Sequence, residues 1–396
     1  MAFVVPRYGS DVVGGAETHC RILAENMAAH GTDVTVLTTC ATDHFTWAND
    51  LPVGESELAG VTVRRFPVGP RDEEVFFALH TSIARGGHLS YGDQIEWMAN
   101  SVWSPQMLEA IVDEAKYDWI VPIPYLFGTS FWAAVTRPKR TALIPCIHDE
   151  PHARTDVVLD LLSGTKGLMP NTATERALIG DFLAQHRGGR RNVADNAPLV
   201  AVGYHDRPLP APSVVEEFRT RHGIDGGYLL YAGRREEGKG VPELFRLYRR
   251  YRSSVPDPIP LVLIGTGHVQ TPADLTPHVI DLGFVDDTDM PAAFAAATVL
   301  VHPSRMESLG MILLEAWMAG TPALVDGRSP VLVEHCRGGG GIWWNSDAEF
   351  IEGIRMLTDD AGITHRLAAA GRTYVQDNFT WPRVRQRFLD ALEGWS

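Results

Sequence analysis

The segment PSRMESLGMILLEAWMAG, residues 303–320, decides which fold this sequence can adopt. It follows a short apolar run, residues 298–301, which predicts a buried parallel strand. From Leu309 onward the apolar residues recur with helical spacing, and Gly320 is typical of a helix end. We therefore predict a strand, a loop, a helix and a further strand, the repeating unit of an open parallel sheet.

Two glutamates mark this segment, Glu307 in the predicted loop and Glu315 inside the predicted helix. Ligands bind beyond the carboxyl ends of strands in such sheets, which is where Glu307 lies. Glu315 interrupts an apolar helix, and a buried carboxylate is costly without a partner. The residues alone leave three readings open for it: solvent exposure, a pair with an arginine, or a ligand contact. Free amides of Leu309, Gly310 and Met311 at the helix start would favour a phosphate.

Length and composition limit the class of protein. A chain of 396 residues exceeds a single core, so we expect two domains of about 200 residues each. The net charge of -14 argues against nucleic acid as a partner. The four cysteines show no metal spacing, which favours a reduced, cytoplasmic protein. No apolar run could span a bilayer, so at most peripheral membrane contact is expected, and the basic runs 137–140 and 187–191 are interpreted as solvated surface.

The amino-terminal stretch predicts a strand at residues 2–6, a helix at about 16–29 and a strand at 34–38. Gly14 and Gly15 lie at the turn between the first strand and the helix. Glycines there let backbone amides approach a phosphate or sugar, although for a glycine pair on its own a simple tight turn is the preferred interpretation. The stretch contains neither the dinucleotide fingerprint nor a P-loop.

A second group of candidates follows the apolar residues 142–147, which predict another strand. His148, Asp149 and Glu150 would lie at its carboxyl end, where sites in α/β proteins are built. A lone histidine is more often structural, and both readings stay open here. Tyr125, in the loop after a predicted strand, is placed at the same edge as a candidate acceptor contact, together with Asp149 and Glu150.

Three further expectations concern the surroundings of this group. Residues 70–105 show no clear periodicity and predict an irregular region that is either inserted or acceptor-facing. Residues 198–203 predict the last strand of the first half, followed by a proline-rich linker at 204–213. His152 is expected to be exposed.

The second half opens with an apolar strand that runs into a glycine-containing loop. Gly233 and Arg234 follow the strand directly, and Lys239 ends the loop before a helix. Two cations at this position would neutralise a diphosphate. The alternative is a solvated charge cluster in which Glu236 or Glu237 pairs with them. Further on, the D-x-D sequence at 287–289 is expected to cap a helix rather than to hold a metal.

Together, the E-x7-E pair and the preceding Gly-Arg-x4-Lys-Gly sequence resemble those of the retaining glycosyltransferases of family 4, the glycosyl transferases group 1. The resemblance implies an α/β architecture, the GT-B fold, with two Rossmann-like parallel-sheet domains that face a cleft. It implies an acceptor-side domain at 1–205, a nucleotide-sugar domain at 214–379, and a carboxyl-terminal helix, 380–396, that returns to the first domain.

The resemblance also implies residue roles. Glu307 would hold the donor sugar and Glu315 the ribose, while Arg234 and Lys239 would bind the diphosphate. His148 would contact the donor sugar from the first domain. The remaining implied donor contacts are Gly14, Gly15, Gly233, Gly265, Phe284, Val285, Ser308, Leu309, Gly310 and Met311. For Phe284 the residues themselves favour core packing.

The expected activity is therefore transfer of a sugar from a nucleotide-diphosphate sugar to an acceptor hydroxyl on a sugar, glycan, lipid or natural product. By family frequency the donor would be a UDP-sugar. The resemblance implies retention of configuration, attack on the same face with the leaving phosphate as base, and neither cofactor nor metal. Two alternatives remain open: a nucleotide-sugar epimerase of similar fold, and a non-catalytic protein that binds nucleotide-sugars or acts as a scaffold.

Overall fold

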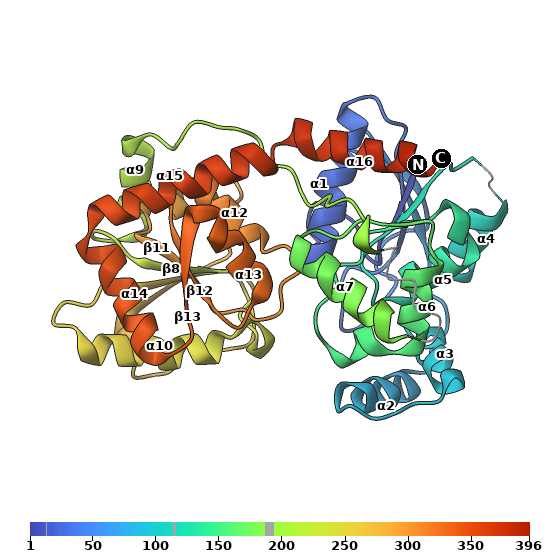
Figure 1. Ribbon diagram of the computed structural model, residues 1–396, viewed down its shortest axis with the longest axis horizontal. Helices are drawn as coiled ribbons and strands as arrows, with labels where there is room; N and C mark the ends of the chain where they lie inside the picture. The colour runs from blue at the N-terminus through green and yellow to red at the C-terminus, as the bar shows by residue number, and fades with distance from the viewer. Residues whose placement is uncertain (13, 114–115, 187–193) are drawn as a thin grey trace. The chain divides into compact units, whose positions relative to one another are not determined.

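The computed structural model describes residues 1–12, 14–113, 116–186 and 194–396. The chain forms two compact units (Figure 1). Unit 1 comprises Met1–Gly203 with Trp381–Ser396, and unit 2 comprises Tyr204–Thr380. The change from one unit to the other thus falls at Gly203, and the chain returns to unit 1 at the first residue of its last helix. The basic run 187–191 lies outside the described residues.

Unit 1 is built on a five-stranded sheet with the strand order β3-β4-β2-β1-β5. Its strands are parallel except β3, which runs antiparallel to β4. The buried sequence AFV of β1 lies between β2 and β5, as expected for an inner strand with neighbours on both sides. A smaller parallel pair, β6 and β7, follows. The strands are β1 Ala2–Val4, β2 Thr35–Thr39, β3 Gly54–Leu58, β4 Val61–Phe66, β5 Ile120–Pro122, β6 Ala142–Leu143 and β7 Gly167–Leu168.

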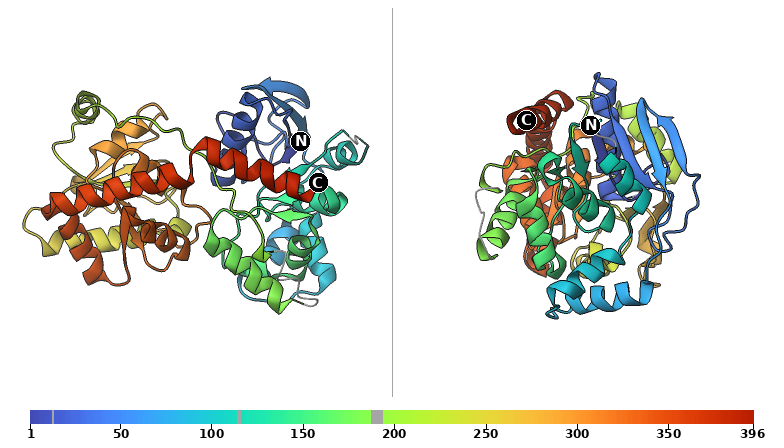
Figure 2. Two further views of the ribbon diagram at one scale, coloured as in Figure 1. Left: turned by 45° about the horizontal axis from the view of Figure 1, so that its top comes forward. Right: turned by 90° about the vertical axis from the view of Figure 1, so that its right-hand side faces the viewer.

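The helices of unit 1 include the last one of the chain. Helix α16 packs on the amino-terminal elements, with Phe388 stacked on Phe3 of β1 at 6.0 Å between ring centroids. Figure 2 shows α16 along one side of this unit, where both chain termini lie. The α-helices are α1 Gly15–Ala29, α2 Glu73–Ala84, α3 Tyr91–Ala99, α4 Pro105–Asp113, α5 Gly128–Thr136, α6 Asp156–Gly164, α7 Ala173–Gln185 and α16 Trp381–Trp395; the 3-10 turns are η1 Pro138–Arg140 and η2 Pro151–Arg154.

Two predictions of secondary structure in unit 1 were wrong. Residues 70–105 are not irregular, since they contain α2, α3 and the start of α4. The sequence did hold a signal, because Ser90 and Asp93 form a capping box that starts α3. Residues 198–203 form no strand. Ala201 adopts a φ of 58°, and a left-handed residue interrupts the extended backbone that a strand needs.

Unit 2 contains a six-stranded parallel sheet with the order β10-β9-β8-β11-β12-β13. Strands β8, β9, β11 and β12 are buried along their whole length, as is typical of a sheet covered by helices on both faces. Figure 1 shows the sheet between α12 and α15 on one side and α10 and α14 on the other. The strands are β8 Leu229–Ala232, β9 Leu261–Ile264, β10 Val279–Gly283, β11 Val299–His302, β12 Ala323–Asp326 and β13 Gly341–Trp344.

The segment 303–320 and its flanking strands fold as predicted, with β11 followed by a loop, α12 and β12. Gly310 has a φ of 71° immediately before α12, and Gly320 has a φ of 84° just after it, so glycine suits both ends. The helices of unit 2 are α9 Pro212–His222, α10 Val241–Ser254, α11 Met290–Ala296, α12 Met311–Met318, α13 Pro330–His335, α14 Asp347–Asp359 and α15 Ala361–Asn378, with 3-10 turns η3 Glu237–Lys239 and η4 Thr276–His278 and a π-helical turn at Cys336–Gly340. Within the described ranges, no helix is long and apolar enough to cross a membrane.

Candidate functional site

The predicted donor residues of unit 2 gather at the carboxyl ends of two neighbouring strands. Strands β8 and β11 pair directly, so the loops that follow them leave the same edge of the sheet. Lys239, at the end of the first loop, donates a hydrogen bond to Oε1 of Glu307 in the second, with 2.8 Å between the two atoms. The fold therefore joins the two sequence motifs by a direct contact.

Glu307 is held as an anion. Its side chain is 13% exposed, and His302 Nε2 lies 3.3 Å from the same Oε1 atom. Burial by itself would raise the pKa of Glu307, but Lys239 and His302 outweigh it and bring the pKa well below its ordinary value. Both partners contact Oε1, and Oε2 makes no hydrogen bond within the part of the chain that the structure describes. His302 was not among the predicted site residues, although it is the last residue of the strand that leads into the motif.

The loop after β8 also holds Arg234. Its guanidinium donates to Glu236 at 2.9 Å, which is one of the pairings that the sequence left open. The side chain of Arg234 nevertheless stays 39% exposed, so other donor atoms face solvent. A Cβ added to Gly265 would overlap the carbonyl oxygen of Gly233, which shows that the missing side chain of Gly265 allows the loops after β8 and β9 to touch.

A buried histidine, His335, contacts the loop that leads into α12. His335 Nε2 lies 2.8 Å from the carbonyl oxygen of Leu309, and its Nδ1 lies 3.0 Å from the hydroxyl of Tyr374. Because a carbonyl only accepts, Nε2 carries the proton and Nδ1 accepts from the tyrosine. Gly310 follows, and a Cβ there would lie 2.7 Å from Leu332. Ser308 belongs to the same loop, and Met311 is the first residue of the helix. No local sequence signal pointed to His335.

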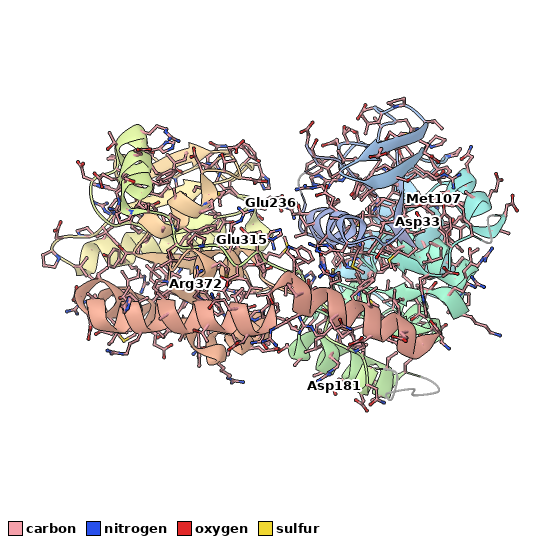
Figure 3. The ribbon with its side chains drawn as sticks, turned by 90° about the horizontal axis from the view of Figure 1, so that it is seen from above. Asp33, Met107, Asp181, Glu236, Glu315 and Arg372 are labelled. Carbon is pink, nitrogen blue, oxygen red and sulfur yellow. The ribbon has the colours of Figure 1, made fainter. Side chains whose placement is uncertain are left out.

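Glu315 lies half-buried in α12, and its carboxylate has no hydrogen-bond or ion-pair partner among the described residues. Burial raises the pKa of Glu315 to about 7, and the neighbouring carboxylate of Asp287 adds to this effect. Figure 3 shows Glu315 and Glu236 at the same end of unit 2. A half-buried carboxylate without a partner keeps acceptor capacity for the polar groups of a ligand.

The residues after β10 differ from two expectations. Phe284 is 69% exposed and does not pack in the core, because β10 is an edge strand with no further layer beyond it. Val285 is buried. Asp289 stands before α11 but does not cap it through its side chain, which pairs with Arg221 at 2.5 Å. Over the described ranges, no group of three or more histidine, cysteine, aspartate or glutamate residues is placed to hold a metal ion.

In unit 1 the structure brings together Tyr125, His148 and Glu150. The buried Tyr125 hydroxyl donates to Glu150 Oε1 at 2.8 Å, and His148 Nδ1 lies 3.4 Å from the same oxygen. Burial by itself raises the pKa of Glu150, but the contacts with His148 and Tyr125 outweigh it and the pKa lies below its ordinary value. Asp149 is not part of this group, since it is exposed and pairs with Arg154 at 2.5 Å.

His152 is buried, contrary to expectation. Its ring stacks on that of His80 in α2, with 4.1 Å between centroids, and its Nε2 lies 3.2 Å from the His80 carbonyl oxygen. Burial, and then His152, lowers the pKa of His80 to about 4. The prediction for His152 was wrong because it did not include α2, the helix whose His80 covers this side chain.

Gly14 and Gly15 precede and begin α1. A Cβ added to Gly14 would overlap the carboxylate of Glu17, which forms a buried ion pair with Arg7 at 2.5 Å. Gly14 is therefore required for the close approach of a carboxylate to the helix start. That position resembles an anion site, and here a side chain of the protein supplies the negative charge. Neither Arg7 nor Glu17 was singled out from the sequence.

Comparisons with known proteins bear on the family and on the fold. Residues 214–374 match the family described as glycosyl transferases group 1. The D-inositol 3-phosphate glycosyltransferase of Arthrobacter sp. (strain FB24) is 25% identical, covering 98% of this chain and 91% of the relative. The enzyme of the same name from Pseudarthrobacter chlorophenolicus is 26% identical over 98% of this chain and 91% of its own length.

Solved structures show the same fold. Anabaena HepE in complex with UDP superposes with a TM-score of 0.72 at 16% identity, covering 99% of both chains. Sucrose-phosphate synthase from Thermosynechococcus elongatus gives a TM-score of 0.72 at 17% identity, covering 99% of this chain and 98% of the other. Residues 214–374 thus belong to the glycosyl transferases group 1, and the chain as a whole is a glycosyltransferase with the GT-B fold.

Proposed function

We propose that the chain transfers a sugar from a UDP-sugar to an acceptor hydroxyl, with retention of the anomeric configuration and without a metal at the diphosphate. The observation that carries this proposal is the contact of Lys239 with Glu307, in the loop that leads to the helix of the unpartnered Glu315. UDP is favoured because proteins of similar fold have been solved with UDP or with UDP-2-fluoro glucose.

The diphosphate would lie against the cations of unit 2. The Lys239 ammonium has three donors and uses one of them on Glu307, while the Arg234 guanidinium has five and uses one on Glu236. Both groups therefore keep donors for phosphate oxygens. They would stabilise the charge that grows on the diphosphate as it leaves, which is an electrostatic contribution to catalysis. The amides at Gly310 and Met311 would add to it at the start of α12.

The two glutamates would hold the sugar parts of the donor. Glu307 is ionised, and its Oε2 atom is the acceptor left over for hydroxyls of the transferred sugar. Glu315 would accept from both ribose hydroxyls. Binding would favour the ionised form, because a protonated carboxyl is a donor at one of its two oxygens. The exposed ring of Phe284 would serve as a stacking surface for the base.

The reaction then needs no side-chain nucleophile. Departure of the diphosphate breaks the anomeric C–O bond and leaves an oxocarbenium-like carbon. The acceptor hydroxyl attacks from the same face, and the leaving phosphate takes its proton. His148 would accept from a sugar hydroxyl through Nε2, because Glu150 is placed to hold the proton on Nδ1. Glu150, held by Tyr125, would thereby act as a positioning residue.

The proposal is tested by incubating the purified protein with UDP-, GDP-, ADP- and TDP-glucose and a panel of acceptors. D-inositol 3-phosphate belongs in that panel because the relatives' name carries it. The products are analysed by proton NMR, with and without EDTA. We expect an α-linked product from an α-linked UDP-sugar, formed equally well with EDTA.

Other outcomes point elsewhere. A β-linked product would contradict retention, and loss of activity in EDTA would contradict metal independence. Conversion of the donor into its epimer without an acceptor would identify an epimerase. Binding of UDP without consumption of any donor, with every acceptor of the panel, would favour a binding protein. UDP at about 100 times its dissociation constant should stabilise the fold by about 2.7 kcal/mol, which gives an independent measure of binding.

A further inference from the structure

A cavity of about 470 Å³ lies in unit 1 at the sheet edge opposite to His148. Lys139 in η1 shortly precedes β6, and Lys166 directly precedes β7. These two strands are parallel, so both lysines stand at their amino-terminal edge, whereas His148 follows the carboxyl end of β6. The volume is in the range of small-molecule sites, which is about 300–1,000 Å³. The cavity is lined by Pro138, Lys139, residues 163–167, Asn196, Ala197 and Trp395.

The two lysine-bearing turns are fixed to one another. The backbone amide of Lys166 donates to the carbonyl of Pro138 at 2.8 Å, and that of Gly167 donates to Thr141 at 3.1 Å. The flanking arginines of η1 are occupied elsewhere, since Arg137 and Arg140 donate to backbone carbonyls. Lys139 and Lys166, both exposed, therefore stand on turns that are hydrogen-bonded to one another and line the same cavity.

The charge of this cavity is unusual for the chain. Only four of its 35 basic residues are lysines, and its net charge is -14, yet two of the four lysines line this one cavity. None of the described lining residues is acidic. Neither ammonium group forms a salt bridge with a carboxylate anywhere in the ranges that the structure describes, in contrast to Lys239. Two ammonium groups that line one cavity without a carboxylate keep their donors for an anion such as a phosphate.

A flat aromatic wall completes the cavity. A Cβ added to Gly167 would overlap the ring of Trp395, so the indole of α16 lies directly on the backbone beside Lys166. The ring also packs against Trp119, with 6.2 Å between centroids. An indole offers apolar contact area to the face of an organic ring, whereas an inorganic phosphate gains nothing from that area.

We propose that this cavity binds a small organic phosphate, with the phosphate held by Lys139 and Lys166 and the organic part against Trp395. The site is separate from the donor site of unit 2 and from the His148 group. The cavity is lined by the end of α16 and by the turns before β6 and β7. A ligand bound there would contact all three segments and would therefore also stabilise unit 1.

The test is calorimetric titration with glucose 6-phosphate and with inorganic phosphate, in the presence and absence of saturating UDP. The variants are Lys139→Ala/Lys166→Ala and, as a matched control, Lys116→Ala, which removes an exposed lysine outside the cavity. We expect one site for glucose 6-phosphate, a loss of affinity of about tenfold or more in the double variant and no change in the control. UDP should bind the double variant normally, which separates this site from the proposed donor site.

The aromatic wall is tested with Trp395→Leu, which should weaken glucose 6-phosphate and leave inorganic phosphate unchanged. The melting temperature without ligand shows whether Trp395→Leu is folded. If it is not, the titration of the Lys139→Ala/Lys166→Ala variant still tests the proposal. Absence of binding by both probes would overturn the proposal. So would equal affinity for the two probes in the wild type, or affinity that is unchanged in the double variant.

Discussion

Replacing Glu315 by glutamine is expected to stabilise the protein above pH 7 and, at the same time, to weaken UDP binding. The carboxylate is half-buried in α12 without a partner among the residues described, and burial raises its pKa from the ordinary 4.5 to about 7. The folded state therefore keeps the proton over a pH range in which the unfolded chain has lost it. Glutamine has the same shape and no charge.

The sign and size of the change in stability follow from the linkage between proton binding and folding. Because the folded pKa is the higher one, stability is unaffected below about pH 4.5, falls as the pH rises from 4.5 to about 7, and stays lower above that. At about 1.36 kcal/mol per pH unit, this interval corresponds to about 3 kcal/mol. Glu315→Gln should recover up to this amount at pH 8, and the gain should shrink toward zero near pH 4.5. For a unit of this size, each kcal/mol shifts the melting temperature by about 2–4 °C.

The assay is urea and thermal unfolding of the variant and the wild type between pH 5 and pH 8. Glu352→Gln serves as the control, since Glu352 lies exposed on α14 and its replacement removes the same charge. UDP titration of the same proteins at pH 8 measures the second effect, and wild-type affinity should rise with pH through the pKa of Glu315.

Two results would refute the reasoning. A Glu315→Gln variant no more stable than the wild type at pH 8 would show that the carboxylate is not desolvated. A stable variant with undiminished UDP affinity would show that Glu315 is buried for another reason and does not hold the ribose.

Three other predictions follow from single contacts. Lys239→Ala should weaken UDP binding by about 1–3 kcal/mol in calorimetry, as for a lost charged hydrogen bond, and unchanged affinity would remove this lysine from the site. His335→Phe leaves the Leu309 carbonyl without its donor, so it should lower stability by about 1–3 kcal/mol and raise the KM for the donor more than it lowers kcat; an unchanged KM would contradict a positioning role. Gly167→Ala forces a methyl group against Trp395 and should destabilise unit 1 by about 1–3 kcal/mol in urea unfolding, whereas wild-type stability would mean that the indole can move away.

The sequence by itself determined the local elements around the donor site. Apolar runs predicted β8 and β11, and helical periodicity predicted α12, each within a few residues. A strand buried on both faces needs consecutive apolar residues, whereas a helix buried along one face needs them every three to four residues. Motif spacing selected Lys239, Glu307 and Glu315. The same method failed for α2 and α3, whose partly exposed apolar residues blur the period.

The tertiary structure alone decided which of these side chains meet. That Lys239 pairs with Glu307 depends on β8 lying next to β11, and strand order is not written in any local pattern. The same holds for His335, which reaches the loop of Glu307 from another helix, and for Phe284, which is exposed because its strand is at the edge. Periodicity reports which face of an element is buried, whereas the partner of a polar group is set by contacts between segments far apart in the chain.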